Sequence, residues 1–436
     1  MTISSSLNAG VTGLNVNASR LATISDNIAN SATYGYKRAT ADFHSLVLDQ
    51  SRGTYSAGGV RVTTGRAVSQ NGTLTTTNNP TDLAIAGRGM IAITSVTAAS
   101  SGAGDLPMSL TSTGSFRADA NGLLRTASGH ALLGWPAATD GTIPEFPRDS
   151  STSLVPVRVS PTELDGQPTT RITLDVNLPA TDTNAGGTYA PRLLPIEYFG
   201  NLGESQNLEV TFTPVAPTPP ATASNSWTME IVDVASGAAP VGSFDIVFDA
   251  TRGAGGTIAS ITPAGATTAT YDATTGLATI TTLGGPVELY VGRPNDARGL
   301  SQLSNTFAPS VSKNGSPVGI LSSIEVDSRG MLSAVYESGF TKVLYQIPVV
   351  NVPNMNGLRP LSNQAYQVSP ESGPFYLWDA GDGPAGEVVG YAREESTTDV
   401  AAELTQLIQT QRAYSSNAKV IQTVDEMLQE TTNIKR

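Results

Sequence analysis

The chain has 436 residues, no cysteine, 14% charged residues and a formal net charge of −12. The length accommodates about two to four domains, each with its own core. The lack of cysteine excludes a disulfide framework and thiolate metal sites, and the acidic balance argues against nucleic acid as a partner, because no basic face would neutralise its phosphates.

The first ten residues, MTISSSLNAG, contain neither a basic segment nor a continuous apolar run. They therefore lack the pattern of a cleaved secretory signal. No run of about 18 apolar residues occurs in the chain, so we expect no membrane insertion. These features predict a protein that is either cytoplasmic or exported by a route that needs no cleaved signal peptide.

An amphipathic helix is predicted over residues 3–30. Arg20 is the only charged residue among the first 25, so even the polar face is nearly neutral. The apolar stripe recurs every seven positions and consists of Leu7, Leu14, Leu21 and Ile28, with Val11, Ala18 and Ile24 beside it. The helix ends in the run DNIANSATYGYKR (26–38), where asparagines and a glycine suit a helix C-terminus and a turn of the chain.

The middle of the chain consists of short runs of Thr, Val, Ile and aromatic residues that are broken by Gly, Asn, Asp and Pro, a pattern typical of an all-β sandwich or barrel. We expect strands at 172–178, 208–213, 243–249 and 343–350, and two similar tight hairpin turns at 119–124 and 327–332. The Pro-rich segment 214–226 predicts an extended loop, and the Thr/Gly-rich segment 274–286 predicts an exposed hairpin or loop.

A second long helix is predicted over residues 399–433. Its stripe also recurs every seven positions and consists of Val400, Leu407, Tyr414, Ile421 and Leu428, widened by Leu404, Ala418, Val420 and Met427. The two terminal helices pair most simply with each other, but one shared face would leave apolar surface uncovered. The alternative is that both helices pack on their own globular body. Uncovered stripes are aggregation liabilities or subunit contacts, and head-to-tail repetition of subunits without ring closure gives a helical filament or tube.

The run DNIANSATYGYKR resembles the signature of the bacterial flagellar rod and hook axial proteins, in which N-N-I-A-N is followed by T, G, F or Y, and K. The matching positions are Asn27, Ile28, Ala29, Asn30, Thr33, Gly35, Tyr36 and Lys37. The resemblance continues over residues 78–93, 112–136, 356–373 and 403–428, well over a third of the chain. One departure is Ser396-Thr397-Thr398-Asp399, where the family usually has S-N-V-D, although Thr and Asp also serve as helix N-caps.

The large β insertion, together with GNLGESQNLEVTF (200–212), is similar to the outer domain of the hook members of this family, whereas rod members are much shorter. The resemblance implies a mainly β chain with helical termini that form an inner coiled-coil layer around an export channel. We expect helical segments at 1–33 and 396–436, a joint at 34–75, an inner β domain at 76–150 and 305–395, and an outer, inserted β domain at 151–304.

The resemblance also implies a structural subunit of the flagellar hook, a curved, flexible tube outside the cell that transmits torque. Its partners would be copies of itself, the hook cap, the distal rod, the hook–filament junction proteins and the flagellar type III export apparatus. The distal rod, a straight rigid tube, is the alternative. The residues expected to carry assembly are Leu7, Val11, Leu14, Leu21, Ile24, Asn27, Ile28, Asn30, Thr33, Gly35, Tyr36, Lys37, Leu404, Leu407, Gln411, Tyr414, Ile421 and Leu428. Lys37→Glu is expected to impair polymerisation while leaving the β domains folded.

The sequence offers little for catalysis, and we expect no enzyme, no cofactor and no metal. His44 and His130 lie in no recognisable nucleophile setting. The run GDGPAG (381–386) matches a nucleotide-binding pattern but does not join a strand to a helix, the context that such a loop requires. A second hypothesis is a secreted β-sandwich adhesin or glycan-binding module with Trp227 or Trp378 as a sugar platform, but it leaves both heptad stripes unexplained.

Overall fold

The computed structural model describes residues 3–46, 58–101, 106–138, 141–160, 164–237, 239–265 and 267–434. The chain forms two compact units. The first comprises Met1–Pro161, Ser322–Val335 and Thr341–Arg436, and the second comprises Thr162–Leu321 and Tyr336–Phe340. The structure confirms a mainly β chain with a long helix at each end.

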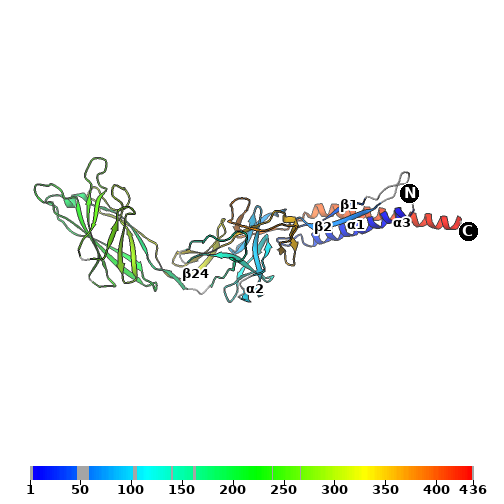
Figure 1. The fold of residues 1–436 in the computed structure, drawn as a ribbon, viewed down its shortest axis with the longest axis horizontal. Coiled ribbons are helices and arrows are strands. Elements are labelled where there is room, and N and C mark those ends of the chain that lie inside the picture. The colour runs from blue at the N-terminus through cyan, green and yellow to red at the C-terminus, as the bar shows by residue number, and fades with distance from the viewer. Residues whose placement is uncertain are drawn as a thin grey trace. The chain divides into compact units, whose positions relative to one another are not determined.

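The terminal helices belong to the first unit and are close to the predicted lengths, α1 at Ile3–Ala29 and α3 at Val400–Ile434. They lie side by side, and the antiparallel hairpin of β1 (Ala39–Ser45) and β2 (Val60–Arg66) runs along α1 (Figure 1). Asp399 caps α3, because its Oδ1 accepts hydrogen bonds from the backbone N–H of Ala401 at 2.9 Å and of Ala402 at 3.2 Å. Asp399 therefore still caps the helix, although residues 396–399 differ from the S-N-V-D motif of the family.

The remainder of the first unit is built from short strands around one main apolar cluster that includes Met90, Leu133, Trp135 and Val350. Its longest run of paired strands follows the order β25-β26-β10-β5-β6-β29-β28. Those strands are β25 (Met331–Tyr336), β26 (Thr341–Gln346), β10 (His130–Pro136), β5 (Met90–Ser95), β6 (Ser109–Thr111), β29 (Tyr366–Gln367) and β28 (Arg359–Pro360).

Smaller pairings complete this unit. β3 (Leu74–Thr76) pairs with β32 (Ala392–Glu394), and β4 (Asp82–Ala86) pairs with β31 (Glu387–Gly390) and β7 (Thr113–Ser115). The other elements are α2 (Val96–Ser101), β8 (Arg117–Ala118), β9 (Leu124–Arg125), β11 (Val155–Pro156), β27 (Val349–Asn351), η2 (Met355–Gly357) and β30 (Tyr376–Trp378).

The second unit is a β-sandwich. One sheet is antiparallel and contains β14 (Arg192–Phe199), β15 (Ser205–Pro214), β16 (Ser226–Asp233), β17 (Pro240–Phe248) and β18 (Ile258–Pro263) in that order. The other contains β19 (Thr270–Asp272), β20 (Leu277–Thr282), β21 (Gly285–Tyr290), β13 (Arg171–Leu178), β22 (Ser301–Gln302) and β23 (Ala308–Lys313). Alternate residues of both sheets meet in one core that includes Leu174, Phe212, Trp227 and Ile280.

The chain enters and leaves the sandwich through a ribbon in which β12 (Leu164–Gln167) pairs with β24 (Ser316–Val326); the short η1 (Ala180–Thr183) follows β13. The second unit thus begins and ends later than the expected 151–304. Leu154 is buried in the core of the first unit, and β23 pairs with β13 of the second.

The two predicted hairpin turns are confirmed and have the same construction. Asp119 Oδ1 accepts from the backbone N–H of Asn121 and Leu123 at 2.8 and 3.1 Å, and Gly122 has a φ of +74°. Asp327 Oδ1 accepts from Arg329 and Met331 N–H at 3.0 and 2.8 Å, and Gly330 has a φ of +76°. A side-chain carboxylate that holds the turn and a glycine in the left-handed region explain why the two sequences look alike.

The other predictions for the β-rich middle hold with two exceptions. Segment 214–226 connects β15 to β16, and segment 274–286 includes the turn of the β20–β21 hairpin. The hairpin is not wholly exposed as expected, because Ala278 and Ile280 are buried in the core. The run 343–350 was expected to be one strand, but it is divided between β26 and β27. The break contains Pro348, which has no backbone N–H to donate to a sheet.

Candidate functional site

The contact between α1 and α3 combines glycines of α1 with polar and apolar residues of α3. An ideal Cβ on Gly10 would lie 3.0 Å from Cγ1 of Ile421, and one on Gly13 would lie 2.7 Å from Nδ2 of Asn417. The fully buried side chains on α3 are Glu403, Thr410 and Val424. The two glycines therefore allow the helices to approach closely.

The predicted stripe of α1 lies beside this contact and not at its centre. Leu7, Leu14, Leu21 and Ile28 are all half-buried, and Ile24 is buried. Val11 is 43% exposed. The N-terminal helix thus keeps part of its apolar surface open within the single chain.

The predicted stripe of α3 is divided between two directions. Leu407 and Ile421 are half-buried, whereas Gln411 is exposed. Large apolar residues with 40–51% of their surface exposed are Val400, Leu404, Ile408, Tyr414, Val420, Met427 and Leu428. The C-terminal helix therefore presents most of its large apolar residues away from its own chain.

Residues 26–38, which include the end of α1 and the residues after it, form a hydrogen-bonded joint. Asn27 is buried; its Nδ2 donates to the Ala39 carbonyl at 2.9 Å, and its Oδ1 accepts from the Ala39 N–H at 2.7 Å and from the Tyr36 hydroxyl at 3.1 Å. Asn30 Nδ2 donates to the carbonyl of Asp26 at 2.9 Å, which also accepts from the Asn30 backbone N–H at 3.1 Å, so the side chain adds a second bond at the helix end.

Gly35 and Thr33 shape the turn. Gly35 has a φ of +71°, and a Cβ there would lie 2.8 Å from Cγ2 of Thr113. Its N–H donates to the Glu394 carbonyl at 2.8 Å, and the hydroxyl of Thr33 donates to Asn30 Oδ1 at 3.3 Å. The glycine is needed both for its conformation and for the close approach of the β part.

Lys37 lies inside the molecule. Its Nζ lies 2.7 Å from Oε1 of Glu394 and 2.7 Å from the carbonyl of Gln70, and both charged side chains are buried. Tyr36 is also buried, and Arg66 stacks on its ring 4.8 Å from the centroid. The expectation that Tyr36 and Lys37 touch a neighbouring subunit is therefore corrected, because contacts within the chain occupy both side chains.

A second buried carboxylate ties α3 to this joint. Glu403 is completely buried and accepts from Asn27 Nδ2 at 3.1 Å and from Nε of Arg38. Arg38 also binds Thr397 through its backbone N–H at 2.8 Å. Glu394 and Glu403 were missed by the sequence analysis, although each lies in or near a block that resembles the family. The only signal in the sequence was that each carboxylate occupies a position where the pattern of apolar residues would also allow an apolar side chain.

The environment of Tyr36 perturbs its ionisation. Burial, reinforced by the hydrogen bond from its hydroxyl to Asp26 at 2.9 Å, raises the pKa of Tyr36 to about 12. The neighbouring Arg66 opposes this shift by favouring the phenolate. The phenol therefore stays protonated and remains a hydrogen-bond donor across the neutral range.

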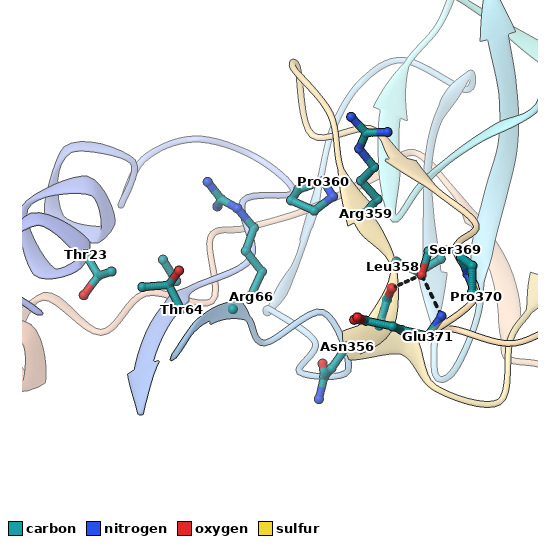
Figure 2. A pocket seen from close by; sticks show the side chains of 13 residues that line it. Thr23, Thr64, Arg66, Asn356, Leu358, Arg359, Pro360, Ser369, Pro370 and Glu371 are labelled. Carbon is teal, nitrogen blue, oxygen red and sulfur yellow. Dashed lines mark hydrogen bonds between the residues drawn. The ribbon is translucent and has the colours of Figure 1, made fainter. Parts of the chain in front are cut away.

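A groove of about 610 Å³ separates the hairpin from two loops of the inner β part. Figure 2 shows Thr23, Thr64 and Arg66 on one side and Asn356, Arg359 and Glu371 on the other. Ser369 braces the second wall, because its hydroxyl donates to the Gly357 carbonyl at 2.5 Å and accepts from the Glu371 N–H at 3.1 Å. The guanidinium of Arg66, in the first wall of the groove, already donates a hydrogen bond to the Lys37 carbonyl at 3.0 Å.

The structure also places the other candidate residues of the sequence. Trp135 and Trp227 are buried and Trp378 is half-buried, so Trp227 offers no sugar platform. The GDGPAG run is a turn closed by a hydrogen bond from the Gly381 N–H to the Gly386 carbonyl at 3.0 Å. His44 is exposed on β1, and burial lowers the pKa of His130.

Within the described residues, no group of three or more His, Asp or Glu side chains is placed to hold a metal ion. No helix in the described ranges combines the length and apolarity needed to cross a membrane.

Comparison with known proteins matches both ends of the chain to families. Residues 7–37 match the family described as "Flagella basal body rod protein", and residues 390–434 match "Flagellar basal body rod FlgEFG protein C-terminal". These two segments contain α1 with the joint run and β32 with α3.

Similarity to curated proteins extends over the entire chain. The chain is 34% identical to the flagellar hook protein FlgE of Brucella suis biovar 1 (strain 1330) over 438 residues, with 100% of both chains covered. It is 32% identical to that of Rhizobium meliloti (strain 1021), again over 100% of both, and 27% identical to that of Salmonella typhimurium, over 99% of this chain and 100% of that one.

Among solved structures, the crystal structure of Helicobacter pylori flagellar hook protein FlgE2 matches 74% of this chain and 99% of that chain, with 13% identity and a TM-score of 0.48. That likeness is too distant to carry an argument. The full-length identity to the curated hook proteins is sufficient by itself: the chain belongs to the flagellar hook protein FlgE family.

Proposed function

We propose that the chain is a structural subunit of the bacterial flagellar hook that polymerises into a curved, flexible tube. The observation that carries this proposal is the set of large apolar residues that α3 leaves 40–51% exposed. Exposed apolar surface of this extent on a single chain favours burial against another protein. Relatives named hook proteins that match from end to end make further copies of this chain the natural partner.

The assembly residues then divide into two groups with different tasks. The exposed and half-buried apolar residues of both helices, together with Gln411, make contacts between copies. Asn27, Asn30, Thr33, Gly35, Tyr36 and Lys37 act indirectly, because they hold the helix pair at a fixed position on the β part of the same chain. A helix pair fixed in this way presents its apolar rows in a reproducible direction.

The layered organisation is part of the proposal. We assign segments 1–33 and 396–436 to an inner helical layer around the export channel and segment 34–75 to the joint. An inner β layer (76–150 and 305–395) and an outer inserted layer (151–304) complete the subunit, with boundaries adjusted to the compact units of the structure. The proposed function depends on association between copies of the chain and not on catalysis.

The partners follow from the same family. We propose contacts with the distal rod, the hook cap and the hook–filament junction proteins at the ends of the tube. We also propose export through the flagellar type III apparatus without a cleaved signal peptide, and a location outside the cell. Nucleic acid and membrane insertion have no part in this function.

Electron microscopy of the assembled full-length protein tests the proposal. Curved, flexible tubes are expected. Straight, rigid tubes would favour the distal rod, and a chain that forms no polymer under any assembly condition would contradict both assignments.

A paired set of variants tests which surface drives assembly. Leu404→Gln with Ile408→Gln removes two exposed apolar side chains of α3 without adding charge, and we expect it to abolish or strongly reduce sedimentable polymer. Thr405→Ala with Gln409→Ala, on exposed polar positions of the same helix, is the matched control. Equal loss in both variants would show that the exposed apolar residues of α3 have no special role.

A further inference from the structure

The two outward faces of the sandwich in the second unit differ in charge. This unit is acidic overall, and its basic residues are only Arg171, Arg192, Arg252, Arg293, Arg298 and Lys313. Half of these cations line a single groove of about 570 Å³ on the solvent side of the sheet that contains β13 and β21. The groove also contains Asp175, so its lining carries three cations and one carboxylate.

The groove retains unused hydrogen-bond donors. Arg171 binds Glu288 through Nη2 at 2.9 Å, and Arg298 lies 3.8 Å from Asp296. Arg293 is exposed and has no ion-pair partner among the described residues. Because each guanidinium carries five N–H donors in a fixed fork, all three arginines can bind further carboxylates.

The opposite sheet carries a diagonal row of carboxylates on its solvent face. Glu197 on β14, Glu209 on β15, Glu230 on β16 and Asp245 on β17 are all exposed, each displaced by two residues from the position directly across the neighbouring strand. Such diagonal neighbours lie about 7–8 Å apart. Only Glu197 has a cation beside it in the described structure, with Lys313 Nζ at 2.9 Å.

Exposed carboxylates at this diagonal spacing repel one another weakly, and the repulsion is strongest at low salt. The repulsion disappears when the row meets cations from outside the unit. The solvent faces of the two sheets point in opposite directions, because both sheets bury their other faces in one core.

We propose that the outer units of two neighbouring copies associate face to face, with the carboxylate row of one seated on the arginine groove of the next. This inference rests on the proposed function, since it needs copies held side by side. The contact is heterologous, as each unit offers one face of each kind, so it propagates from copy to copy without closing. Charged contacts of this kind select the partner while adding little affinity, so they can break and re-form as a tube bends.

Charge reversal on the full-length chain tests the pairing. Glu209→Lys with Glu230→Lys, and separately Arg293→Glu with Arg298→Glu, are each expected to raise the critical concentration for assembly at low salt about tenfold, a factor that corresponds to about 1.4 kcal/mol. The chain that carries all four changes should return close to the original value. Glu325→Lys with Glu337→Lys, exposed and without ion pairs in the described structure, is the control for net charge.

A fourfold variant no better than either double variant would overturn the pairing. Site-directed disulfides provide an independent check, because the chain has no cysteine of its own. Tubes assembled from a mixture of Glu230→Cys and Arg293→Cys copies should yield a disulfide-linked dimer, whereas tubes that form normally without this dimer would refute the contact. If the unaltered chain forms no tube at all, the failure belongs to the proposed function.

Discussion

At the scale of single residues, two buried carboxylates hold the joint between helices and sheet. Glu394 binds Lys37 and also accepts from the backbone N–H of Gly72 at 2.7 Å. Glu403 lies on the first turn of α3, and its Oε2 has no hydrogen-bond partner in the described structure. Buried charges of this kind contribute little net stability but strongly penalise any arrangement that separates them from their partners.

Removing the charge of Lys37 should therefore destabilise the fold of the first unit, and not only a contact between subunits. Lys37→Met leaves Glu394 buried without its cation, and we expect a loss of about 3–5 kcal/mol in the unfolding free energy of the first unit. Lys37→Glu should be worse, since it places two carboxylates together, and this revises the expectation that the β domains stay folded. Urea unfolding followed by circular dichroism measures the loss.

Two variants define the cause of that loss. Lys37→Met combined with Glu394→Met should recover much of the stability, because no unpaired charge remains buried. Lys419→Met, on the exposed side of α3, should have almost no effect. A Lys37→Met chain as stable as the original would show that the buried pair is unimportant.

The raised pKa of Tyr36 predicts a loss of stability in strong base. An unfolded tyrosine releases its proton near pH 10, whereas the folded one keeps it to about 12. Between these values the folded state binds more protons than the unfolded state, so the unfolding free energy falls as the pH rises. Tyr36→Phe should lower stability at neutral pH by removing the bonds to Asp26 and Asn27, yet show a shallower fall above pH 10 than the original chain.

Tyr34→Phe is the control for this measurement, because Tyr34 is 40% exposed and makes its contact through its ring, with Arg393 at 3.9 Å. Its unfolding free energy at neutral pH should match that of the original chain. Tyr366, whose pKa burial also raises to about 12, will retain part of the slope in every variant. Identical slopes for Tyr36→Phe and the original chain would count against the assignment.

At the scale of secondary-structure elements, the two terminal helices make close contact through glycine. We expect Gly13→Ile to force α1 away from α3, because Cγ of Asn417 would lie only 3.1 Å from the new Cβ. Overpacking of this kind costs about 1–3 kcal/mol. Asn8→Ile, on an exposed position of the same helix, is the matched control. Polymer yield by sedimentation should fall only for Gly13→Ile, and a yield equal to the control would mean that the close approach is not needed.

The sequence revealed the helices and most strands because their periodicities are local. Seven-residue spacing identified α1 and α3 to within about one residue at each end, and alternation identified β13, β15 and β17. The sequence did not reveal which side of α3 faces α1. Thr410 and Asn417 look like surface residues in a pattern, yet Thr410 is buried and Asn417 lies against Gly13 of α1.

Long-range partners were equally hidden. Lys37 and Glu394 are 357 positions apart, and no local spacing connects them. The family signature correctly marked Asn27, Gly35 and Lys37 as special, but it did not say whether they serve the chain itself or its neighbour. Burial settles that question only once the fold is known.

At the scale of the whole molecule, the second unit is an insertion whose two ends meet. Thr170 N–H donates to Asn314 Oδ1 at 3.0 Å, and Asn314 Nδ2 donates to Thr170 Oγ1 at 2.8 Å. Residues 171–313 can therefore be replaced by a short Gly-Ser turn that leaves the β12–β24 ribbon closed. The terminal helices and the joint lie outside the deleted segment.

We expect the shortened chain to form tubes that are straighter or stiffer than those of the full chain, because the outer contacts that shift during bending are gone. Electron microscopy and measured persistence length test this outcome. A shortened chain restored with an unrelated compact domain of similar size controls for bulk. Tubes with unchanged curvature and flexibility would show that the outer unit does not govern bending.

The exposure of large apolar residues on α3 affects how assembly begins. A copy at the end of a tube has one side of this apolar surface covered by the copy before it, whereas two free chains must order both helices and find each other at once. The end of an existing tube should therefore bind free chains far faster than free chains associate with one another. Assembly should show a lag, and adding sheared fragments of tube as seeds should remove it.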